Sequence, residues 1–306
     1  MELKERKNCP LCGTENIRLF KTGTIQPENV RTEDFKITDS HYGSLWTFYE
    51  CKHCRFVFFN PYVPEASIIE FYAQLEDHEY SEEAAGRTRN FETIFKRLKR
   101  FQPGPTLLDV GAASGIFLQF AQREGFHIQG IEPSRFLVAE AQKRYGLNLF
   151  NGTIETYPTG KKFSVVTLLD IIEHLVNPDS FMNAVDKLVE DNGLLVIVTP
   201  DIHSLAARLT GKSWWHYRIA HINFFNLPAL RYLLTAHGYK ILLKKKYVWH
   251  FSLFYLLTRI FPSLKNTKPT EKALQKWLKK VHLKLPLMDS WEIYARKTTR
   301  KTSDTQ

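Results

Sequence analysis

Residues Thr106–Gly115 read T-L-L-D-V-G-A-A-S-G, and this stretch decides the fold. Leu107 and Leu108 are typical of the end of a buried parallel strand, because such strands are covered on both faces and are apolar throughout. Gly111 and Gly115 then allow a sharp turn and a close approach of the backbone to a ligand. The apolar residues directly after the turn predict a helix. The stretch therefore predicts a strand–turn–helix unit that binds a ligand at its turn.

A second strand and an acidic residue follow at the spacing of a nucleoside-binding sheet. Residues 125–131 are predicted as the strand, and Glu132 stands at its carboxyl end. A carboxylate about 20 residues beyond the glycine turn accepts hydrogen bonds from both hydroxyls of a ribose. The third glycine of the dinucleotide fingerprint is missing, so the two glycines alone would be a weak signal, and the downstream acid strengthens it. Asp109, beside the turn, suits a ligand that carries positive charge.

This pattern resembles the class I S-adenosylmethionine-dependent methyltransferases. The family's first motif matches Asp109 to Gly115, its ribose-binding acid matches Glu132, and its fourth motif matches residues 165–175. The resemblance implies an α/β fold, a Rossmann-like doubly wound seven-stranded sheet in the strand order 3-2-1-4-5-7-6, and S-adenosylmethionine as cofactor. The residues that it places at the cofactor are Tyr80, Asp109, Gly111, Ala112, Gly115, Glu132, Gly152 and Asp170.

Tyr80 enters this set because similar methyltransferases cap the methionine end of the cofactor with a tyrosine upstream of the core. Tyr72 is the second candidate for that role, and a surface turn is the alternative for Tyr80. Residues 64–101 around them are predicted to be largely helical from the spacing of their apolar side chains.

The remaining elements follow from apolar runs and turn residues. A helix is predicted from Pro133 to Tyr145, with Gly146 as its stop. The other predicted elements are a third strand at 147–150, a fourth at 163–169, a helix at 180–190, a fifth strand at 194–199, a helix from about 226, a sixth strand at 239–245 and a seventh at 291–296.

Two histidines are candidate catalytic bases. His174 follows the Asp-x-x-Glu pattern of the fourth motif, and His221 lies in an aromatic loop, residues 212–226, expected over the mouth of the sheet. A neutral imidazole accepts a proton from a hydroxyl, an amine or an acidic carbon. Some zinc-ribbon sugar C-methyltransferases have a Glu-His pair in a similar place, but Ala220 replaces the acid here. A purely structural role in ordering a loop stays open for both histidines.

The four cysteines form two C-x-x-C pairs near the N-terminus: Cys9, Cys12, Cys51 and Cys54. This spacing resembles a zinc ribbon, in which four thiolates hold one tetrahedral zinc ion. Four thiolates leave no position for water, so this zinc is expected to be structural. Two disulfides or a redox pair are the alternatives, although disulfides are rare in the cytosol. The aromatic run 56–59 is expected to pack the ribbon onto the rest of the chain.

Residues 246–288 separate the last two strands, which normally form a close antiparallel pair in this fold. Their aromatic run 247–261 is too short to cross a bilayer. Two interpretations stay open: a lid helix over the substrate pocket, or shallow contact of residues 246–265 with an anionic membrane.

Four segments describe the predicted organisation: a zinc ribbon at 1–62, a helical linker that covers the cofactor at 63–105, the methyltransferase domain at 106–298 with its insert, and a disordered tail at 299–306. The formal net charge of +10 is concentrated toward the C-terminus. A basic region could bind an anionic membrane, a nucleic acid or an acidic substrate, and the charge alone does not distinguish among these partners. No signal peptide is evident, which favours the cytoplasm, with the inner face of a membrane as an option.

The sequence thus predicts an S-adenosylmethionine-dependent methyltransferase that acts on a small molecule, a sugar or a lipid-linked glycan. The alternative is a module that binds adenosylmethionine without catalysis, or one that recruits a nucleic acid or a protein partner. No basic run follows the ribbon, so nucleic acid is the less favoured partner.

Overall fold

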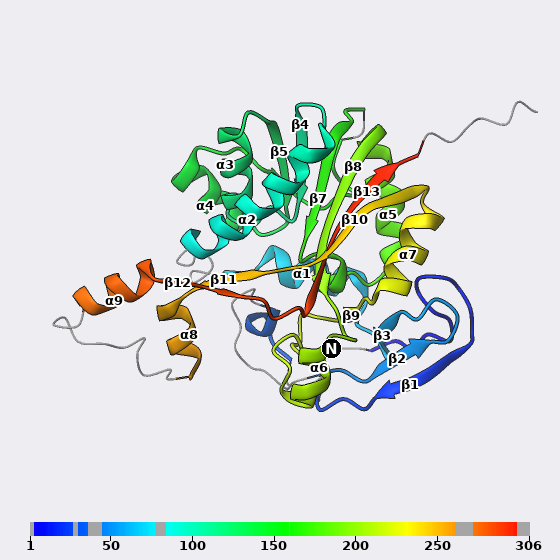
Figure 1. Ribbon diagram of the computed structural model, residues 1–306. Helices are drawn as coiled ribbons and strands as arrows, with labels where there is room; N and C mark the ends of the chain where they lie inside the picture. Colours follow the sequence, from blue (N-terminus) through cyan, green and yellow to red (C-terminus); the bar gives the residue numbers. More distant parts are fainter. Residues whose placement is uncertain are drawn as a thin grey trace, which may run out of the picture.

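The computed structural model describes residues 3–26, 30–35, 45–76, 84–158, 160–260 and 272–298. At its centre is a seven-stranded sheet in the order β10-β13-β8-β7-β4-β5-β6 (Figure 1). Read in chain order from the opposite edge, this is 3-2-1-4-5-7-6, and the predicted order is confirmed. The strands are β4 (Thr106–Val110), β5 (His127–Glu132), β6 (Phe150–Asn151), β7 (Phe163–Leu169), β8 (Val189–Pro200), β10 (Tyr239–Lys246) and β13 (Ser290–Lys297).

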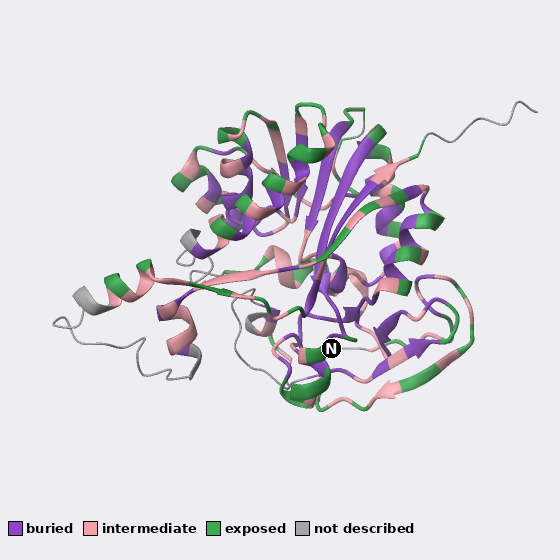
Figure 2. Cartoon of the chain, viewed as in Figure 1, coloured by how far each residue is buried: buried purple, intermediate pink, exposed green. Residues whose placement is uncertain are grey.

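Helices cover both faces of this sheet because successive strand residues point to opposite sides. Leu107 belongs to the apolar cluster under one set of helices, and its neighbour Leu108 belongs to the cluster under the other set. Figure 2 shows the buried strands between helices whose outer sides are exposed. The first set is α2 (Ala84–Leu98), α3 (Ile116–Arg123) and α4 (Arg135–Tyr145), and the second is α5 (Pro178–Leu188) and α7 (Leu227–Ala236).

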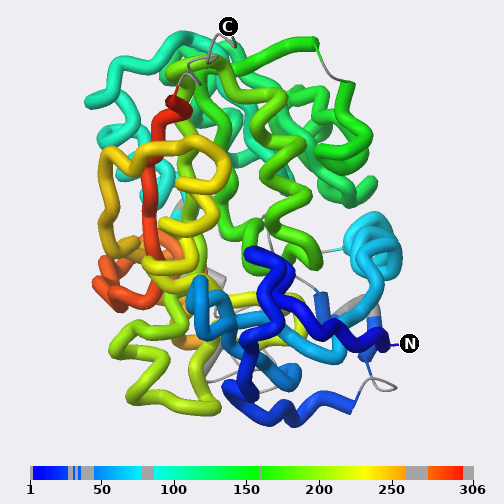
Figure 3. The backbone as a smooth tube through the Cα atoms, turned by 90° about the vertical axis from the view of Figure 1, so that its right-hand side faces the viewer, coloured from blue at the N-terminus to red at the C-terminus, as the bar shows by residue number. Residues whose placement is uncertain are grey.

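A second sheet joins the N-terminal segment to the loop after β8. Its strands are β1 (Ile17–Lys21), β2 (Phe48–Cys51), β3 (Val57–Phe59) and β9 (Asn223–Phe224), in the order β1-β2-β3-β9. Figure 3 shows the blue N-terminal chain and the yellow-green loop together in the lower part of the molecule. Because β9 pairs with β3, the ribbon and the loop share one sheet and one aromatic core.

The segment between β10 and β13 forms an arm that projects from the body (Figure 1). Its strands β11 (Trp249–Ser252) and β12 (His282–Leu285) pair antiparallel, and it carries helices α8 (Leu253–Ile260) and α9 (Lys272–Lys280). The predicted lid helix over 247–261 is therefore wrong for its first part. Trp249 and Phe251 alternate with His250 and Ser252, which is the period of a strand.

The short elements lie on the loops around the sheet. They are the helix α1 (Glu65–Ala73), the helix α6 (Leu205–Thr210), and the 3₁₀ turns at Thr32–Phe35, Lys99–Phe101, Ile172–His174 and Gly211–Ser213. The region 64–101, predicted to be largely helical, contains α1 and α2. Tyr80 and the predicted tail 299–306 lie outside the described residues.

Three predicted boundaries shift for local reasons. Helix α4 begins after Pro133, because the Ser134 hydroxyl accepts a hydrogen bond from the Leu137 amide and takes the N-cap. The third strand moves from 147–150 to β6, since Leu147 is buried and packs in the cluster with α3 and α4. Helix α5 ends at Leu188, where the extended backbone of β8 begins.

Candidate active site

A cavity of about 590 Å³ opens at the carboxyl ends of the parallel strands, where open α/β sheets bind their ligands. Two groups of residues line it. One group, which we call the glycine-turn side, is Gly111, Glu132, Gly152 and Asp170. The other, which we call the histidine side, is Tyr72, Glu173, His174, His216 and His221.

The glycine turn requires a glycine at position 111, because its backbone lies close to the next loop and has a left-handed conformation. Gly111 has a φ of +74°, and a Cβ atom there would lie 2.1 Å from Cδ1 of Ile171. The Gly111 and Ala112 amides both donate to the Ile131 carbonyl, at 2.8 and 3.0 Å. Gly115 begins helix α3 at a φ of +77°. The turn therefore places Gly111 on the cavity wall, whereas Ala112 and Gly115 stand behind it.

Asp109 also stands behind the wall. Its Oδ1 accepts a hydrogen bond from the Thr167 hydroxyl at 2.6 Å, which joins the neighbouring strands β4 and β7. Burial raises the pKa of Asp109 to about 7. The structure thus gives this carboxyl a role in fixing the turn, and direct contact with the cofactor stays a prediction.

Glu132 presents its carboxylate at the end of β5. One oxygen accepts the Ala113 amide at 2.8 Å and the other accepts the Ser134 amide at 2.9 Å. Burial raises the pKa of Glu132 to about 7, against the lowering effect of those two amides. Each carboxylate oxygen has a second lone pair that can accept a further hydrogen bond. Gly152, whose amide donates to the Glu132 carbonyl at 3.2 Å, lies beside it on the wall.

Asp170 ends β7 in an unusual conformation, with a φ of +56°. Its Oδ1 is buried and has no hydrogen-bond partner among the described residues. Burial raises the pKa of this carboxyl to about 6, and the charges of His216 and Arg87 oppose that effect. A carboxylate held this way on a cavity wall is suited to a cationic group of a ligand.

Glu173, His174 and His221 converge on the histidine side. Glu173 is fully buried, and its Oε2 accepts the Thr199 hydroxyl at 2.9 Å. His174 Nδ1 lies 2.8 Å from the Ala220 carbonyl and 2.7 Å from the Tyr72 hydroxyl. Burial lowers the pKa of His174 to about 4 and lowers that of His221 well below its usual value. The two histidines predicted from sequence are thus neighbours, with ring centroids 4.9 Å apart.

Tyr72, the second candidate for capping the cofactor, contacts His174 through its hydroxyl. Burial raises the pKa of that hydroxyl, so the phenol stays protonated. This contact places Tyr72 on the histidine side.

Sequence reasoning placed His216 in the loop over the mouth of the sheet but gave it no role, and it missed Asp289. His216 Nε2 lies 3.0 Å from Asp289 Oδ2, and two tryptophan indoles, Trp215 and Trp249, donate to the same carboxylate at 2.7 and 3.0 Å. Burial works to raise the pKa of Asp289, but the contact with His216 and the indole donors hold it below its usual value. Nothing in the spacing of these residues indicates the pair, because Asp289 follows the arm and His216 lies in the loop before β9.

Comparison with protein-family models identifies the family of this domain. A family model described as a methyltransferase domain matches residues 78–244, more than half of the chain. The chain belongs to this methyltransferase domain family.

Curated relatives cover part of the chain. The mitochondrial ubiquinone biosynthesis O-methyltransferase of Schizosaccharomyces pombe is 27% identical over 129 residues, which are 40% of this chain and 47% of that protein. The ubiquinone biosynthesis O-methyltransferase of Escherichia fergusonii is 28% identical over 155 residues, 44% of this chain and 61% of that protein. The chain thus spans about half the length of the curated relatives that it matches.

Solved methyltransferase structures are also similar to this chain. Magnesium protoporphyrin IX methyltransferase from Synechocystis PCC 6803, with bound SAH, aligns at a TM-score of 0.47 and 15% identity, over 73% of this chain and 89% of that one. A plantazolicin methyltransferase, in complex with a desmethyl analogue and SAH, aligns at a TM-score of 0.45 and 16% identity. The alignment covers 69% of this chain and 83% of that one.

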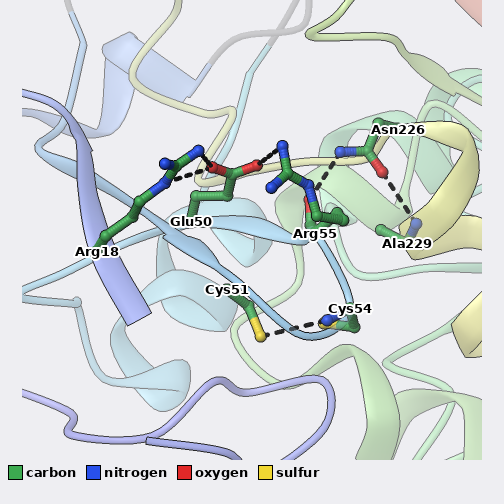
Figure 4. Close-up of polar contacts among 7 residues, drawn as sticks. All are labelled: Arg18, Glu50, Cys51, Cys54, Arg55, Asn226 and Ala229. Carbon is green, nitrogen blue, oxygen red and sulfur yellow. Dashed lines mark hydrogen bonds and ion pairs between the residues drawn. The ribbon is translucent and has the colours of Figure 1, made fainter. Parts of the chain in front are cut away.

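Outside the methyltransferase domain sheet, the four cysteine sulfurs all lie within 4.8 Å of one another. The separations are 3.6 Å for Cys9–Cys54 and 3.5 Å for Cys12–Cys51, and all four thiols are free. Tetrahedral Zn–S bonds of about 2.3 Å separate sulfurs by about 3.8 Å. The Cys54 amide points at the Cys51 sulfur at 3.4 Å (Figure 4). The donor set and its spacing fit zinc.

The second cysteine knuckle is tied to the methyltransferase domain by Asn226. Its side chain donates to the Arg55 carbonyl at 2.7 Å and accepts the Ala229 amide at 2.9 Å, so it caps helix α7 as well (Figure 4). Glu50, buried in the same sheet, pairs with Arg18 and Arg55. The ribbon is therefore joined to the domain by polar contacts and by the shared β3–β9 pairing.

The arm contributes the outer wall of the cavity. Trp249, Phe251 and Tyr255 line it, and their rings stack in sequence at 5.6 and 5.2 Å. Trp277 of α9 is 57% exposed beside lysines. Part of the predicted membrane-contact stretch, residues 261–265, lies outside the described residues. None of the helices in the described part of the chain combines the length and the apolar character that crossing a bilayer requires.

Proposed function

We propose that the protein is an S-adenosylmethionine-dependent methyltransferase that methylates a small-molecule acceptor. The observation that carries this proposal is that one cavity is lined both by Glu132 with its glycine turn and by a cluster of three histidines. The cofactor and the acceptor would then meet in a single cavity. The membership of the methyltransferase domain family supports the same activity.

On the glycine-turn side, three groups would hold the cofactor. Glu132 keeps a free lone pair on each oxygen for the two ribose hydroxyls. Gly111 lets the backbone approach the ligand, and the unpartnered Asp170 oxygen suits the ammonium of the methionine group. When bound, S-adenosylmethionine supplies a methyl group activated by a sulfonium.

On the histidine side, the residues would bind the acceptor and receive its proton. We assign the role of general base to His216. Asp289 would fix its ring and stabilise the imidazolium that forms when it takes the proton of the acceptor. The assignment of the base to His174 or His221 stays a prediction from sequence. An oxygen acceptor is favoured, since the curated relatives are named O-methyltransferases.

The size of the cavity and its aromatic walls bear on the kind of acceptor that it can hold. Its volume of about 590 Å³ has to hold the cofactor and the acceptor together, which favours a small acceptor group. Aromatic walls from the arm suit the apolar face of a sugar ring as well as a planar acceptor. A sugar, or the end sugar of a lipid-linked glycan, remains part of the proposal. We favour the lid interpretation for the arm, because its rings line the cavity, and membrane contact remains the rival.

We also propose one structural zinc ion in the cysteine site. It would hold β2 and β3 in the geometry that pairs with β9 and so support the loop that carries His216 and His221. A cytoplasmic location stays a prediction.

Transfer of labelled methyl from S-adenosylmethionine into an extract of the source cells tests the function. The products are separated into small-molecule, lipid, protein and nucleic-acid fractions. Label in the small-molecule or lipid fraction, lost with Glu132→Ala and kept with the surface variant His127→Gln, supports the proposal. Label in nucleic acid or protein overturns the acceptor class. Absence of label from every fraction, with the cofactor still bound, supports the alternative of a non-catalytic binding module.

A further inference from the structure

We propose that Glu173, His174 and His221 form a binding site for a divalent transition-metal ion on the histidine side of the cavity. The ion would bind the acceptor oxygen. This inference deepens the proposed function and rests on it for the role of the ion, although the presence of the site can be measured independently.

The first argument is the spacing of the donor atoms. Each of the three residues offers one ligand atom, and these atoms lie within 4.8 Å of one another. Two ligands that share a zinc-like ion at about 2.0–2.2 Å are separated by about 3 to 4 Å. Two imidazoles and one carboxylate are also the donor set of open transition-metal sites.

The second argument is that two donor atoms are buried without partners. Glu173 is 0% exposed and His221 is 5% exposed. Glu173 Oε1 and His221 Nδ1 nevertheless have no hydrogen-bond partner among the described residues. A buried polar atom without a partner costs about 1–3 kcal/mol, so it marks a place where a ligand is expected.

The third argument is the way in which the two rings are oriented. His174 Nδ1 lies 2.8 Å from the Ala220 carbonyl and 2.7 Å from the Tyr72 hydroxyl, and these contacts fix that edge of the ring. With the Nδ1 proton donated to Ala220, His174 Nε2 keeps its lone pair for a ligand, and the unpartnered Nδ1 of His221 is the second candidate donor atom. Metal-ligating histidines are held in this manner. Thr199 holds the other oxygen of Glu173 in the same way, at 2.9 Å.

The site differs from the cysteine site in its chemistry. Four thiolates fill a coordination shell, whereas three ligands from Glu173, His174 and His221 leave positions open. An acceptor hydroxyl bound at an open position loses its proton more readily, because the ion withdraws electron density from the oxygen. In the balanced step, the proton goes to His216 and the oxygen forms a bond to the methyl carbon. The sulfur–methyl bond breaks, and its electron pair stays on sulfur.

Zinc stoichiometry of the full-length protein tests the site. The protein is dialysed against buffered free Zn²⁺, and bound zinc is measured by mass spectrometry. We expect two ions per wild-type chain, one in the cysteine site and one in the proposed site. Glu173→Gln and His221→Ala should each retain one, with affinity for the second ion at least about 100-fold weaker. The matched control is His127→Ala, an exposed histidine at the opposite end of β5, which should retain two ions.

Binding of S-adenosylmethionine, measured on the same samples, separates the two proposals. Variants that bind the cofactor normally and hold one zinc support the site, because their fold is intact. One zinc ion in both the wild type and the variants overturns the metal site and leaves the methyltransferase proposal standing. Two zinc ions in the wild type, the Glu173→Gln variant and the His221→Ala variant alike also overturn it. Failure of the wild type to bind the cofactor overturns the proposed function, whatever the zinc count.

Discussion

The glycine-turn side of the cavity comes from segments that lie close in the chain, residues 111–170, whereas the histidine side is assembled from distant ones. Tyr72 comes from α1, Glu173 and His174 follow β7, and His216 and His221 lie in the loop before β9. The first side is built on the strands β4 to β8 of the central sheet and the loops that follow them. The second also depends on the N-terminal sheet, which pairs with the loop through β3 and β9, and on the arm, whose Asp289 contacts Trp215 and His216 of the loop.

If the two sides have the proposed roles, this difference predicts that cofactor binding and acceptor binding can be disrupted separately. Damage to the ribbon, the loop or the arm is expected to change catalysis and leave cofactor affinity nearly unchanged. Damage to the turn is expected to do the reverse. The following predictions measure catalysis, cofactor affinity or the stability of the parts on which they depend.

The largest effect is expected from His216→Gln. Glutamine keeps an N–H donor toward Asp289 but cannot take a proton from the acceptor. We expect kcat to fall by about 10²–10⁴-fold, the usual contribution of a general base. The affinity for S-adenosylmethionine should stay within about twofold. Steady-state kinetics and calorimetric titration measure the two quantities. A kcat within threefold of wild type would remove His216 from the mechanism.

The same difference explains what could be predicted from the sequence. The turn, Glu132 and Asp170 were found because a strand end and a glycine turn are local patterns with fixed spacing. The strand order was implied by the resemblance of those patterns to the class I methyltransferases. The Asp289–His216 pair was missed because the two residues meet only through the packing of the arm on the loop. Likewise, β9 is two residues long and exists only through its pairing with β3.

A loss of at least about 100-fold in cofactor affinity is expected from Glu132→Ala. The variant removes two acceptors for ribose hydroxyls, and each hydrogen bond to a charged group contributes about 1.5–3 kcal/mol. The Ala113 and Ser134 amides also lose their partner. Zinc content should remain that of the wild type, as measured by mass spectrometry. Loss of zinc together with the cofactor would show that the two regions are not separable.

Cys51→Ser tests whether damage to the cysteine site slows methyl transfer and leaves cofactor binding intact. With one thiolate missing, the zinc affinity of the ribbon falls, and β3 no longer supports β9 in its place. We expect the rate of methyl transfer to fall by about tenfold, while cofactor affinity changes less than about threefold. The control is Lys52→Ala, an exposed residue of the same knuckle. An equal loss of cofactor affinity would contradict the separation of the two sides.

The pH dependence of cofactor affinity isolates the glycine-turn side. Because burial raises the pKa of Glu132 to about 7, its carboxylate becomes protonated as the pH falls below 7. We expect affinity to decrease by up to about tenfold per pH unit below that value. Calorimetric titration between pH 5.5 and 8 measures this, and Glu132→Gln removes the contribution of that carboxylate. A smaller slope below about pH 6 is still expected in Glu132→Gln from Asp170, whose pKa burial raises to about 6, whereas an unchanged slope would contradict the assignment to Glu132.

The stability of the ligand-free protein should run in the opposite direction with pH. Folded-state pKa values of Asp109 and Glu132 near 7 exceed those of the unfolded chain, so the folded protein binds more protons between about pH 4 and 7. These two groups therefore lower the free energy of unfolding as the pH rises through that window. Thermal unfolding with and without S-adenosylmethionine checks the sign, and Glu132→Gln should flatten the ligand-free curve.

The smallest effect is expected from Asn226→Ala. This change removes the N-cap of α7 and the tie to the Arg55 carbonyl, and it should lower the free energy of unfolding by about 1–2 kcal/mol. Asn226→Asp restores the cap acceptor but not the amide donor, so it separates the two contributions. If the tie matters for the loop before β9, both variants slow methyl transfer slightly and leave cofactor affinity unchanged. If only Asn226→Ala loses stability and neither variant changes the rate, the cap alone matters, and the ribbon supports the histidine side through β3 and β9 instead.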